Sequence, residues 1–388
     1  MLKETISFAC GQTPDFFAQF PAVPAVFLLR GADAAAEPYV GKTASLRRRL
    51  QRLLSPAESR SKRLNLRDRV ATIEYSLCGS DFESGLLLYK VLRREFPKTY
   101  QKRLRLRPAA LVRLNLENEY PRAYVTTRLG RLSGKSRYYG PFRSRTVAES
   151  FLNDSLDLFK MRRCTFDLNP DPKFPGCVYS EIKMCLAPCF KGCTDDEYAA
   201  EVGRVQAYLD TGGQSLITEM EAERERLSAK LDFEAAAQLH AKITKVRSIV
   251  SGLDEISCRL DQLDAVIVQP APIADPNSVA LFRFRQGELA GPRLFAVETP
   301  GEGQSLEQRV RETLQEFAPA GADSTAQFSE ELAILKRWYY RTHKAGEIIV
   351  ANAEGEISAR RITNTVMRIY RGEKAPPTSP RPAEPPRV

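Results

Sequence analysis

The sequence has little histidine and no long apolar run. No uninterrupted stretch reaches the length of about 20 apolar residues that a spanning helix needs, so we expect no membrane association. The first residues, Met-Leu-Lys-Glu-Thr, do not resemble a basic and then apolar export signal, so the expected location is cytoplasmic, where thiols stay reduced. The cysteines, eight in number, are therefore interpreted as ligands before disulfides.

Positive charge is concentrated in one part of the chain. Residues 42–107 contain 18 lysines and arginines against 6 aspartates and glutamates, a net charge of +12, whereas the whole chain carries +10. A solvated helix face usually carries both signs, so this excess indicates a surface that binds the phosphate backbone of a nucleic acid. The expected contacts are six arginines: Arg47, Arg48, Arg52, Arg63, Arg103 and Arg105.

Apolar spacing predicts an α/β (α+β) fold made of several units. The Pro-rich residues 375–388 are predicted to be disordered. The predicted elements are, in chain order, a hairpin over 24–41, a helix over 45–54, a strand over 71–78, a helix over 82–96, strands over 110–116 and 120–128, a turn over 138–142, a helix over 146–159, helices over 196–251, and mixed strands and helices over 264–370.

A cluster of cysteines follows the first two units. Cys164, Cys177, Cys185 and Cys189 lie within 26 residues. Clustered thiols in a reducing compartment usually hold a metal, and because no histidine lies nearby the site would consist of thiolates alone. Structural zinc and an iron–sulfur cluster both fit such a set, and the spacing does not choose between them. The alternative is a group of buried free cysteines.

Residues 218–250 contain two amphipathic helices separated near Asp232. Asp232 is a favourable N-cap for the second helix. Leu231, Phe233, Ala236 and Leu239 supply apolar surface that a partner hairpin would cover, because a two-helix hairpin has too small a core to stand alone. Packing against its own chain explains the same pattern equally well.

Four stretches, in this order, resemble the UvrC family of bacterial nucleotide-excision-repair subunits. Pro-Tyr-Val-Gly-Lys-Thr at 38–43 is similar to the second half of a GIY-YIG nuclease motif, and Tyr-Gly-Pro-Phe at 139–142 is similar to a turn of the family. Cys-x-Tyr-x-x-x-Lys-x-Cys-Leu-Ala-Pro-Cys at 177–189 resembles the cysteine region of the family, and Leu-Asp-Phe-Glu-Ala-Ala at 231–236 resembles its UVR motif. The resemblance covers residues 18–370.

The resemblance implies domains, cofactors and partners. It implies a [4Fe–4S] cluster on the four cysteines, with zinc as the alternative, and docking on UvrB through the UVR hairpin. It also implies DNA as the substrate, cut on the 3′ side of damage with the help of Mg²⁺ or Mn²⁺. The implied units are a GIY-YIG-like domain over 18–107, a linker with the cysteine region over 108–195, a helical region with the UVR motif over 196–255, and a UvrC-like α/β region over 262–372.

The nuclease motif is only partly present. Tyr39, Lys42 and Arg49 match family positions, among them the tyrosine that activates water and the arginine that stabilises the developing charge. Four other family positions are substituted, and one of them is the position of the carboxylate that binds the metal. The substituted positions are Phe27 and Leu53 in place of tyrosines, Tyr89 in place of the metal-binding glutamate, and Gln101 in place of an asparagine.

Glu83 is the nearest acidic residue before Tyr89 on the same predicted helix. Positions six apart on a helix point in different directions, so Glu83 is a poor substitute and we expect cleavage to be weak or lost. Family members also continue with an RNase H-like nuclease and a helix-hairpin-helix module, whereas a Pro-rich tail follows here. We therefore expect no 5′ incision from this chain.

The sequence supports three hypotheses. The first is a UvrC-like repair subunit that binds DNA and UvrB with impaired or lost 3′ incision. The second is a working 3′ endonuclease in which Glu83 or another carboxylate holds the metal. The third is an adaptor outside repair that uses the basic domain on nucleic acid.

Overall fold

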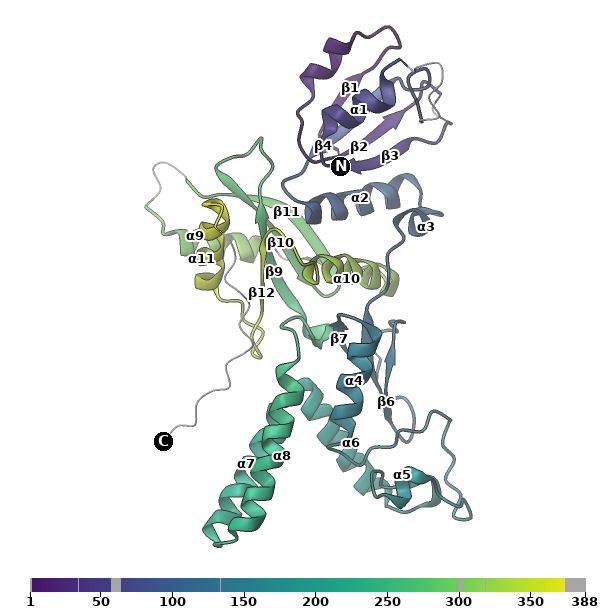
Figure 1. The fold of residues 1–388 in the computed structure, drawn as a ribbon, viewed down its shortest axis with the longest axis vertical. Coiled ribbons are helices and arrows are strands. Elements are labelled where there is room, and N and C mark those ends of the chain that lie inside the picture. Colours follow the sequence, from purple (N-terminus) through teal and green to yellow (C-terminus); the bar gives the residue numbers. More distant parts are fainter. Residues whose placement is uncertain are drawn as a thin grey trace.

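The computed structural model describes residues 2–33, 35–56, 64–132, 134–298, 303–317 and 319–373. Arg63 and the Pro-rich segment predicted to be disordered lie outside these residues. The described chain is elongated and contains three four-stranded sheets. The predicted α/β class is confirmed (Figure 1).

The N-terminal module is an antiparallel sheet in the order β1-β4-β2-β3 with helices on both faces. Helix α1 buries four leucines against one face, as its spacing predicts. Strand β1 pairs with β4, so the module begins before residue 18, where the sequence placed its start. The elements are β1 (Glu4–Ser7), η1 (Pro14–Gln19), β2 (Ala25–Arg30), β3 (Tyr39–Thr43), α1 (Leu46–Leu54), β4 (Thr72–Leu77), α2 (Asp81–Glu95) and α3 (Tyr100–Leu104).

The middle region is built on a sheet in the order β6-β5-β7-β8. The predicted turn at 138–142 is wrong, because these residues form most of the inner strand β7. Gly140-Pro141 suggested a turn, but the pair is accommodated opposite a register shift between Ala110 and Val112. The elements are β5 (Ala110–Asn115), β6 (Arg122–Thr126), β7 (Arg137–Phe142), α4 (Arg145–Leu156), α5 (Val178–Glu181), η2 (Pro188–Phe190), α6 (Asp195–Asp210) and β8 (Cys258–Arg259).

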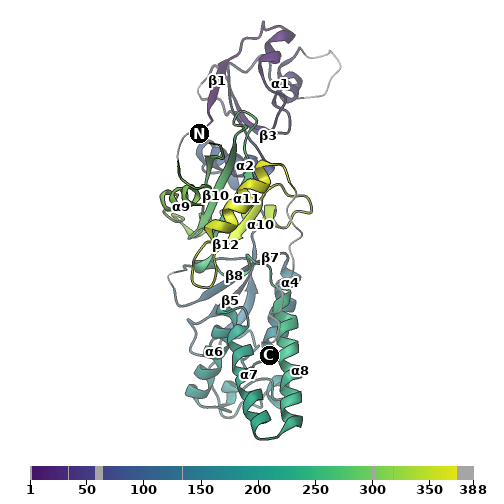
Figure 2. The same ribbon diagram turned by 90° about the vertical axis from the view of Figure 1, so that its left-hand side faces the viewer.

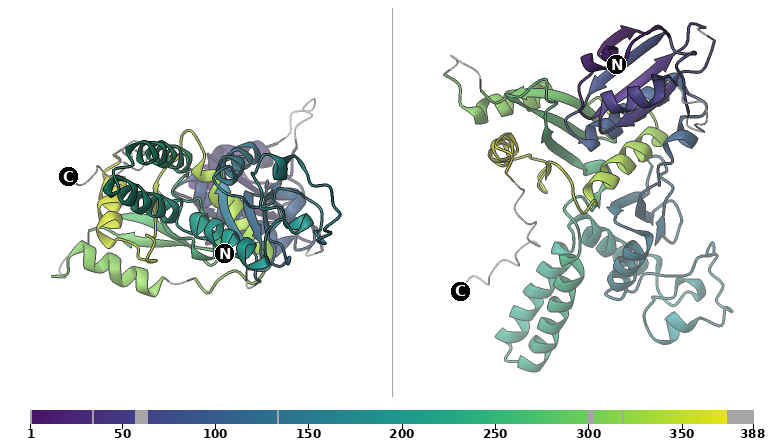
Figure 3. Two further views of the ribbon diagram at one scale, coloured as in Figure 1. Left: turned by 90° about the horizontal axis from the view of Figure 1, so that it is seen from below. Right: turned by 45° about the horizontal axis from the view of Figure 1, so that its top comes forward.

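Helices α7 (Gln214–Ala229) and α8 (Phe233–Ser251) form the predicted hairpin, which projects from the middle region (Figure 3). Gly213 makes the tight turn into α7 at a φ of +91°, and a Cβ there would lie 2.4 Å from Val250 Cγ1. At the far end, the Asp232 carboxylate accepts a hydrogen bond from the Ala235 amide at 3.1 Å, so the predicted N-cap is confirmed.

The C-terminal region is an antiparallel sheet in the order β11-β10-β9-β12. Helices α9 and α11 cover one face, where Val266 and Val268 lie in the core with Val310 and Ile362. Figure 2 shows α9 and α11 beside the strands β10 and β12. The elements are η3 (Leu260–Gln262), β9 (Asp264–Pro270), β10 (Ser278–Arg285), β11 (Glu288–Ala296), α9 (Leu306–Glu316), α10 (Thr325–Tyr339), β12 (Glu347–Val350) and α11 (Ala359–Tyr370).

The other face of this sheet is covered by α10 and by α2 of the N-terminal module. Phe82 of α2 lies with its ring centroid 5.0 Å from that of Phe282 and 5.1 Å from that of Trp338. Residues of α2 and of the C-terminal sheet therefore belong to one hydrophobic core. The first and last units of the chain are packed together, although the middle region and the hairpin separate them in the sequence.

Candidate functional site

Two of the three residues that match the nuclease motif lie in contact. Tyr39 on β3 accepts a hydrogen bond from Arg49 Nη2 on α1 at 2.7 Å, while Arg49 Nε is buried without a hydrogen-bond partner among the described residues. Phe27 on β2 is fully buried next to Tyr39, with ring centroids 6.1 Å apart. A Cβ on Gly41 would lie 3.2 Å from the Phe27 ring, so the glycine leaves room for the ring. Tyr39 and Arg49 thus keep an ordered pair beside a residue that has no hydroxyl.

Lys42 points to the opposite face of the sheet, because side chains alternate along a strand. Its ammonium group forms an ion pair with Asp81 at 2.6 Å, and Asp81 is also paired with Arg341 after α10. Burial alone would raise the pKa of Asp81, but the two cations outweigh it and hold that pKa below its usual value. Lys42 is therefore part of a bridge to the C-terminal region.

Tyr89 and Gln101 lie away from Tyr39 and Arg49. Tyr89 is buried in the core shared with the C-terminal region, and its hydroxyl bonds to Glu330 of α10 at 3.1 Å. Gln101 Nε2 donates to the same carboxylate at 2.7 Å, and the Tyr100 hydroxyl does so at 3.0 Å. The structure turns these side chains toward α10 and does not bring them together with the tyrosine and arginine of the motif.

The middle of the sheet-facing side of α2 is apolar, where Leu87, Leu88 and Val91 pack with Val26 and Val40. The carboxylates at its two ends are paired with sheet residues, Asp81 with Lys42 and Glu95 with Arg30. Glu83, in the first turn of α2, accepts a hydrogen bond from the Gly79 amide at 2.8 Å. Burial raises the pKa of Glu83, and the Gly79 bond opposes that rise. Glu83 thus closes the turn into α2.

The predicted basic contacts divide into two groups. Arg47 donates to the carbonyl oxygens of Phe20 and Ala18, so it ties α1 to η1. Arg103 forms an ion pair with Glu37 at 2.8 Å. The other predicted contacts within the described residues are exposed: Arg48, Arg52 and Arg105.

The four predicted metal-binding cysteines are brought near one another. Burial raises the pKa of Cys185 to about 11, the Ala187 amide lowers it, and the thiols of Cys164, Cys189 and Cys177 add to the rise. Cys193 differs, because it lines a hollow of about 490 Å³ together with Asp195 at the start of α6 and Glu119. Within the described residues, no three His, Cys, Asp or Glu side chains stand close enough to hold an ion without movement.

The donor set fits a tetrathiolate group. The Cys185 Sγ accepts the Ala187 amide at 3.3 Å, and the Cys164 Sγ accepts Arg162 Nη1 at 3.3 Å. Hydrogen bonds to sulfur of this kind stabilise thiolates and tune the bound group. The cysteine region supplies four thiols with donors already directed at two of them.

The hairpin has two different ends. At its base, Ile243 and Val246 are fully buried in the core of the middle region. At its tip, Leu231 and Phe233 are 73% and 63% exposed. Ala236 and Leu239, the other predicted partner contacts, are half-buried. Packing against its own chain therefore holds the base, and the described residues leave the tip uncovered.

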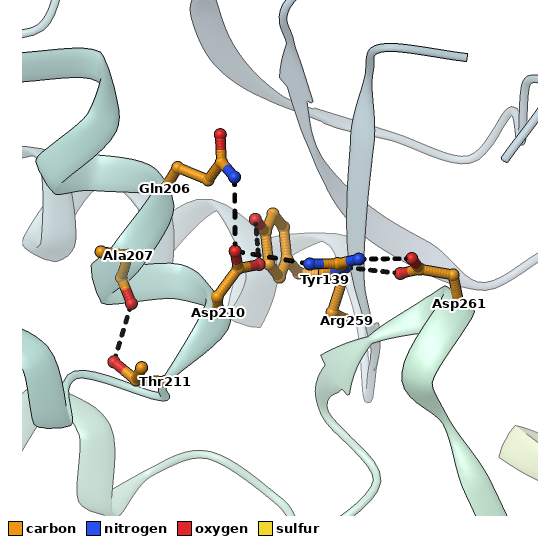
Figure 4. A network of polar contacts seen from close by, with 7 residues as sticks. All are labelled: Tyr139, Gln206, Ala207, Asp210, Thr211, Arg259 and Asp261. Atoms are coloured by element: carbon orange, nitrogen blue, oxygen red, sulfur yellow. Dashed lines mark hydrogen bonds and ion pairs between the residues drawn. The ribbon is translucent and has the colours of Figure 1, made fainter. Parts of the chain in front are cut away.

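A polar network fixes the root of the hairpin to the sheet (Figure 4). The buried Tyr139 hydroxyl on β7 donates to Asp210 at the end of α6 at 2.8 Å. Asp210 also pairs with Arg259 at 3.5 Å, and Arg259 pairs with Asp261 at 2.6 Å. Burial, with the neighbouring Asp210 charge, strongly raises the pKa of Tyr139. This network links β7, α6 and β8.

Sequence reasoning missed Glu330, Asp210 and Arg162. Glu330 meets residues about 230 positions away, and no local pattern marks such a partner. In the sequence, Asp210 is indistinguishable from an ordinary carboxylate at the end of a helix. Arg162 had one available signal, since it lies two residues before the first cysteine of the cluster.

Together these features define the class: a mixed α/β protein with a cysteine-containing middle domain that carries a helical hairpin. Residues 111–208 match the family model of the UvrC/Cho excinuclease middle domain. Residues 214–249 match the model of the UvrB/uvrC motif. The resemblance indicated by the cysteine spacing and by residues 231–236 is confirmed.

Several curated relatives of the chain share one name. The chain is similar to the UvrABC system protein C of Xylella fastidiosa, at 27% identity over 91% of this chain and 59% of the relative. It is similar to the protein of the same name from Methanothermobacter thermautotrophicus at 25% identity over 89% of this chain and 57% of the relative. For that of Dehalococcoides mccartyi the identity is 24% over 87% and 56%.

The chain spans less than three fifths of the length of these relatives. No solved structure matches it. None of the helices in the described part is long and apolar enough to cross a membrane.

Proposed function

We propose that the protein is a UvrC-like subunit of the nucleotide-excision-repair excinuclease that binds DNA and UvrB, with impaired or lost 3′ incision. The observation that carries this proposal is the exposed tip of the hairpin, where Leu231 and Phe233 lie uncovered within a segment that matches the UvrB/uvrC motif. Large apolar side chains exposed side by side mark an interaction surface.

The tip is built to present these side chains. Leu231 takes a left-handed backbone conformation with a φ of +63°, which is unfavourable for a leucine. The Asp232 amide donates to the Leu227 carbonyl at 3.0 Å, which fixes the turn. Burying each apolar side chain in a partner would contribute roughly 1.5–3 kcal/mol. A matching hairpin of UvrB offers such a surface.

Loss of incision is supported by the surroundings of the nuclease-like positions. Phosphodiester hydrolysis by a metal-dependent nuclease needs a carboxylate to hold the ion. Phe27 supplies no hydroxyl, Tyr89 and Gln101 are bonded to Glu330, and Glu83 is bonded to the Gly79 amide. The ordered Tyr39–Arg49 pair therefore has no carboxylate directed at it within the described residues.

DNA binding is assigned to the exposed arginines of the N-terminal module. Arg48 and Arg52 lie on α1, and Arg105 lies after α3. Cationic side chains on an exposed helix face contact phosphates without reading sequence. This role does not need the nuclease-like positions to be complete.

The four cysteines would hold a [4Fe–4S] cluster, with structural zinc as the alternative. When bound, either group would cross-link the cysteine region and contribute directly to its stability. Cys164, Cys177, Cys185 and Cys189 are the ligands in this proposal.

A second candidate function is a working 3′ endonuclease that uses an unusual carboxylate. Asp81 favours it, because this carboxylate lies 2.6 Å from Lys42, a residue that matches the nuclease motif. An ion at Asp81 would have to displace both Lys42 and Arg341. Glu83, in the same turn of α2, is another carboxylate of this module.

UvrB binding by the full chain tests the main proposal. Substituting Phe233→Ser should weaken binding to immobilised UvrB by about 30-fold or more, because a buried aromatic anchor is lost. Ile273→Ser is the matched control, since Ile273 is 71% exposed in the β9–β10 loop and should leave binding unchanged. Equal binding by wild type and Phe233→Ser would overturn the assignment of the tip.

A further inference from the structure

Arg162 is a buried arginine at the entrance to the cysteine region. Its side chain is only 1% exposed. The Nε atom donates to the Tyr120 carbonyl at 2.9 Å, and Nη1 donates to the Phe166 carbonyl at 2.9 Å and lies 3.3 Å from Cys164 Sγ. These contacts fix the guanidinium plane beside the first cysteine.

The charge of Arg162 has no acidic partner in the described part of the chain. Its hydrogen-bond acceptors are two neutral carbonyl oxygens and a sulfur, and Nη2 is buried with no hydrogen-bond partner in the part of the chain that the structure describes. Burying a guanidinium without an opposite charge is strongly unfavourable, because the charged group loses its hydration. A group of this kind that is retained in a folded protein needs a negative charge nearby.

The neighbouring arginine provides a contrast. Arg163 forms an ion pair with Asp157 at 2.7 Å and stacks on the Tyr179 ring at 5.5 Å. Its charge is thus balanced by a carboxylate. These two neighbouring arginines therefore differ in that Arg163 has a carboxylate as counter-charge and Arg162 has none among the described residues.

We propose that Arg162 is the counter-charge of a tetrathiolate group on Cys164, Cys177, Cys185 and Cys189. The inference rests on the proposed metal or cluster at these cysteines. Zn²⁺ or a [4Fe–4S] core bound by four thiolates carries a net charge of about −2. A fixed guanidinium that touches one of the sulfurs offsets part of that charge, and its unused Nη2 donor is available to the same group.

Two consequences distinguish this role from simple packing. A positive charge next to the group favours its reduced, more negative state, so removing Arg162 should lower the reduction potential of an iron–sulfur cluster. The positive charge of Arg162 also disfavours protonation and release of the Cys164 thiolate. Loss of an outer-shell partner of this kind typically weakens metal retention by about 10–100-fold.

The test uses the full chain, purified without oxygen, in four variants: Arg162→Gln, Arg162→Lys, Cys164→Ala as the reference for a lost ligand, and the control Arg163→Gln. Iron, sulfide and zinc contents are measured, followed by the rate of metal release to a chelator and, for iron, the midpoint potential. We expect Arg162→Gln to release the metal about 10–100-fold faster than wild type. Arg162→Lys should fall between them, and Arg163→Gln should match wild type.

Each outcome decides one part of the inference. If wild type contains neither iron nor zinc, the proposed metal site fails and the role of Arg162 fails with it. If wild type holds metal and Arg162→Gln releases it at the wild-type rate with an unchanged potential, only the role of Arg162 is overturned. If Arg162→Gln does not fold, Arg162→Lys decides: retention above that of Cys164→Ala supports a charge effect, and release as fast as that of Cys164→Ala contradicts it.

Discussion

The nuclease-like positions and the hairpin tip differ in how far their side chains are buried and paired within the chain. Around the nuclease-like positions, most polar groups are paired within the chain: Tyr39 with Arg49, whose buried Nε has no partner among the described residues, and Tyr89 with Glu330. At the tip, Leu231 and Phe233 remain uncovered. The N-terminal module is held as part of a larger folded unit, whereas the tip keeps surface available for another molecule. We expect a partner to bind at the tip, because its exposed apolar side chains lie within the segment that matches the UvrB/uvrC motif.

The base and tip of the hairpin give the largest expected difference. Ile243→Ala at the base should lower the free energy of unfolding by about 2–5 kcal/mol, because it leaves a cavity in the core of the middle region. Phe233→Ala at the tip should change it by less than about 0.5 kcal/mol. Urea unfolding of both variants measures the two effects. A similar loss at both positions would contradict the distinction between them.

The contact of α10 with the rest of the protein should depend on pH through Glu331. This carboxyl is almost fully buried and accepts hydrogen bonds from the Leu289 amide and from Gln327. Burial raises its pKa to about 7, which the Leu289 bond opposes. Because the folded-state pKa lies above the unfolded one, the folded protein binds a proton more tightly, and stability from this group is present below the unfolded pKa and lost as pH rises toward 7.

The expected size of this loss is on the order of 2–3 kcal/mol between pH 4.5 and 7.5. Urea unfolding across that range measures it. Glu331→Gln serves as the control, since an amide of the same shape does not titrate and should flatten this part of the profile. A profile with the same slope in both proteins would show that Glu331 does not control the stability of this interface.

Charge reversal on α1 should have the smallest effect. Arg48→Glu with Arg52→Glu should weaken binding to duplex DNA by roughly tenfold and reduce the slope of log affinity against log salt by about 2, because two phosphate contacts are lost. Arg311→Glu, on an exposed face of α9, is the control and should leave the slope unchanged. An unaltered slope in the double variant would place DNA binding elsewhere.

Local periodicity was enough to predict most elements and the position of the hairpin. The leucines of α1 and the Asp232 cap follow directly from residue spacing and side-chain chemistry. The inner strand β7 could not be predicted, because the shift opposite Gly140-Pro141 depends on how β5 pairs with it.

The contacts that cross the chain were also beyond local reasoning. Helix α2 carries Leu87 and Val91 on one side and Phe82 and Leu86 on the other, and a helix that is apolar on two sides is buried on two sides. That pattern could have shown that a second surface covers α2, but not that it belongs to the C-terminal sheet. The direction of Tyr89 follows from the same packing.

The most direct test is Mg²⁺- or Mn²⁺-dependent incision of a lesion-containing duplex by the anaerobically purified chain, with UvrB bound to the same DNA. Arg49→Ala and Asp81→Asn serve as controls. We expect the chain to join the UvrB–DNA complex and to make no 3′ incision above the level of either variant. Incision by wild type that disappears in Arg49→Ala and Asp81→Asn would contradict it and identify a working nuclease with an unusual metal ligand.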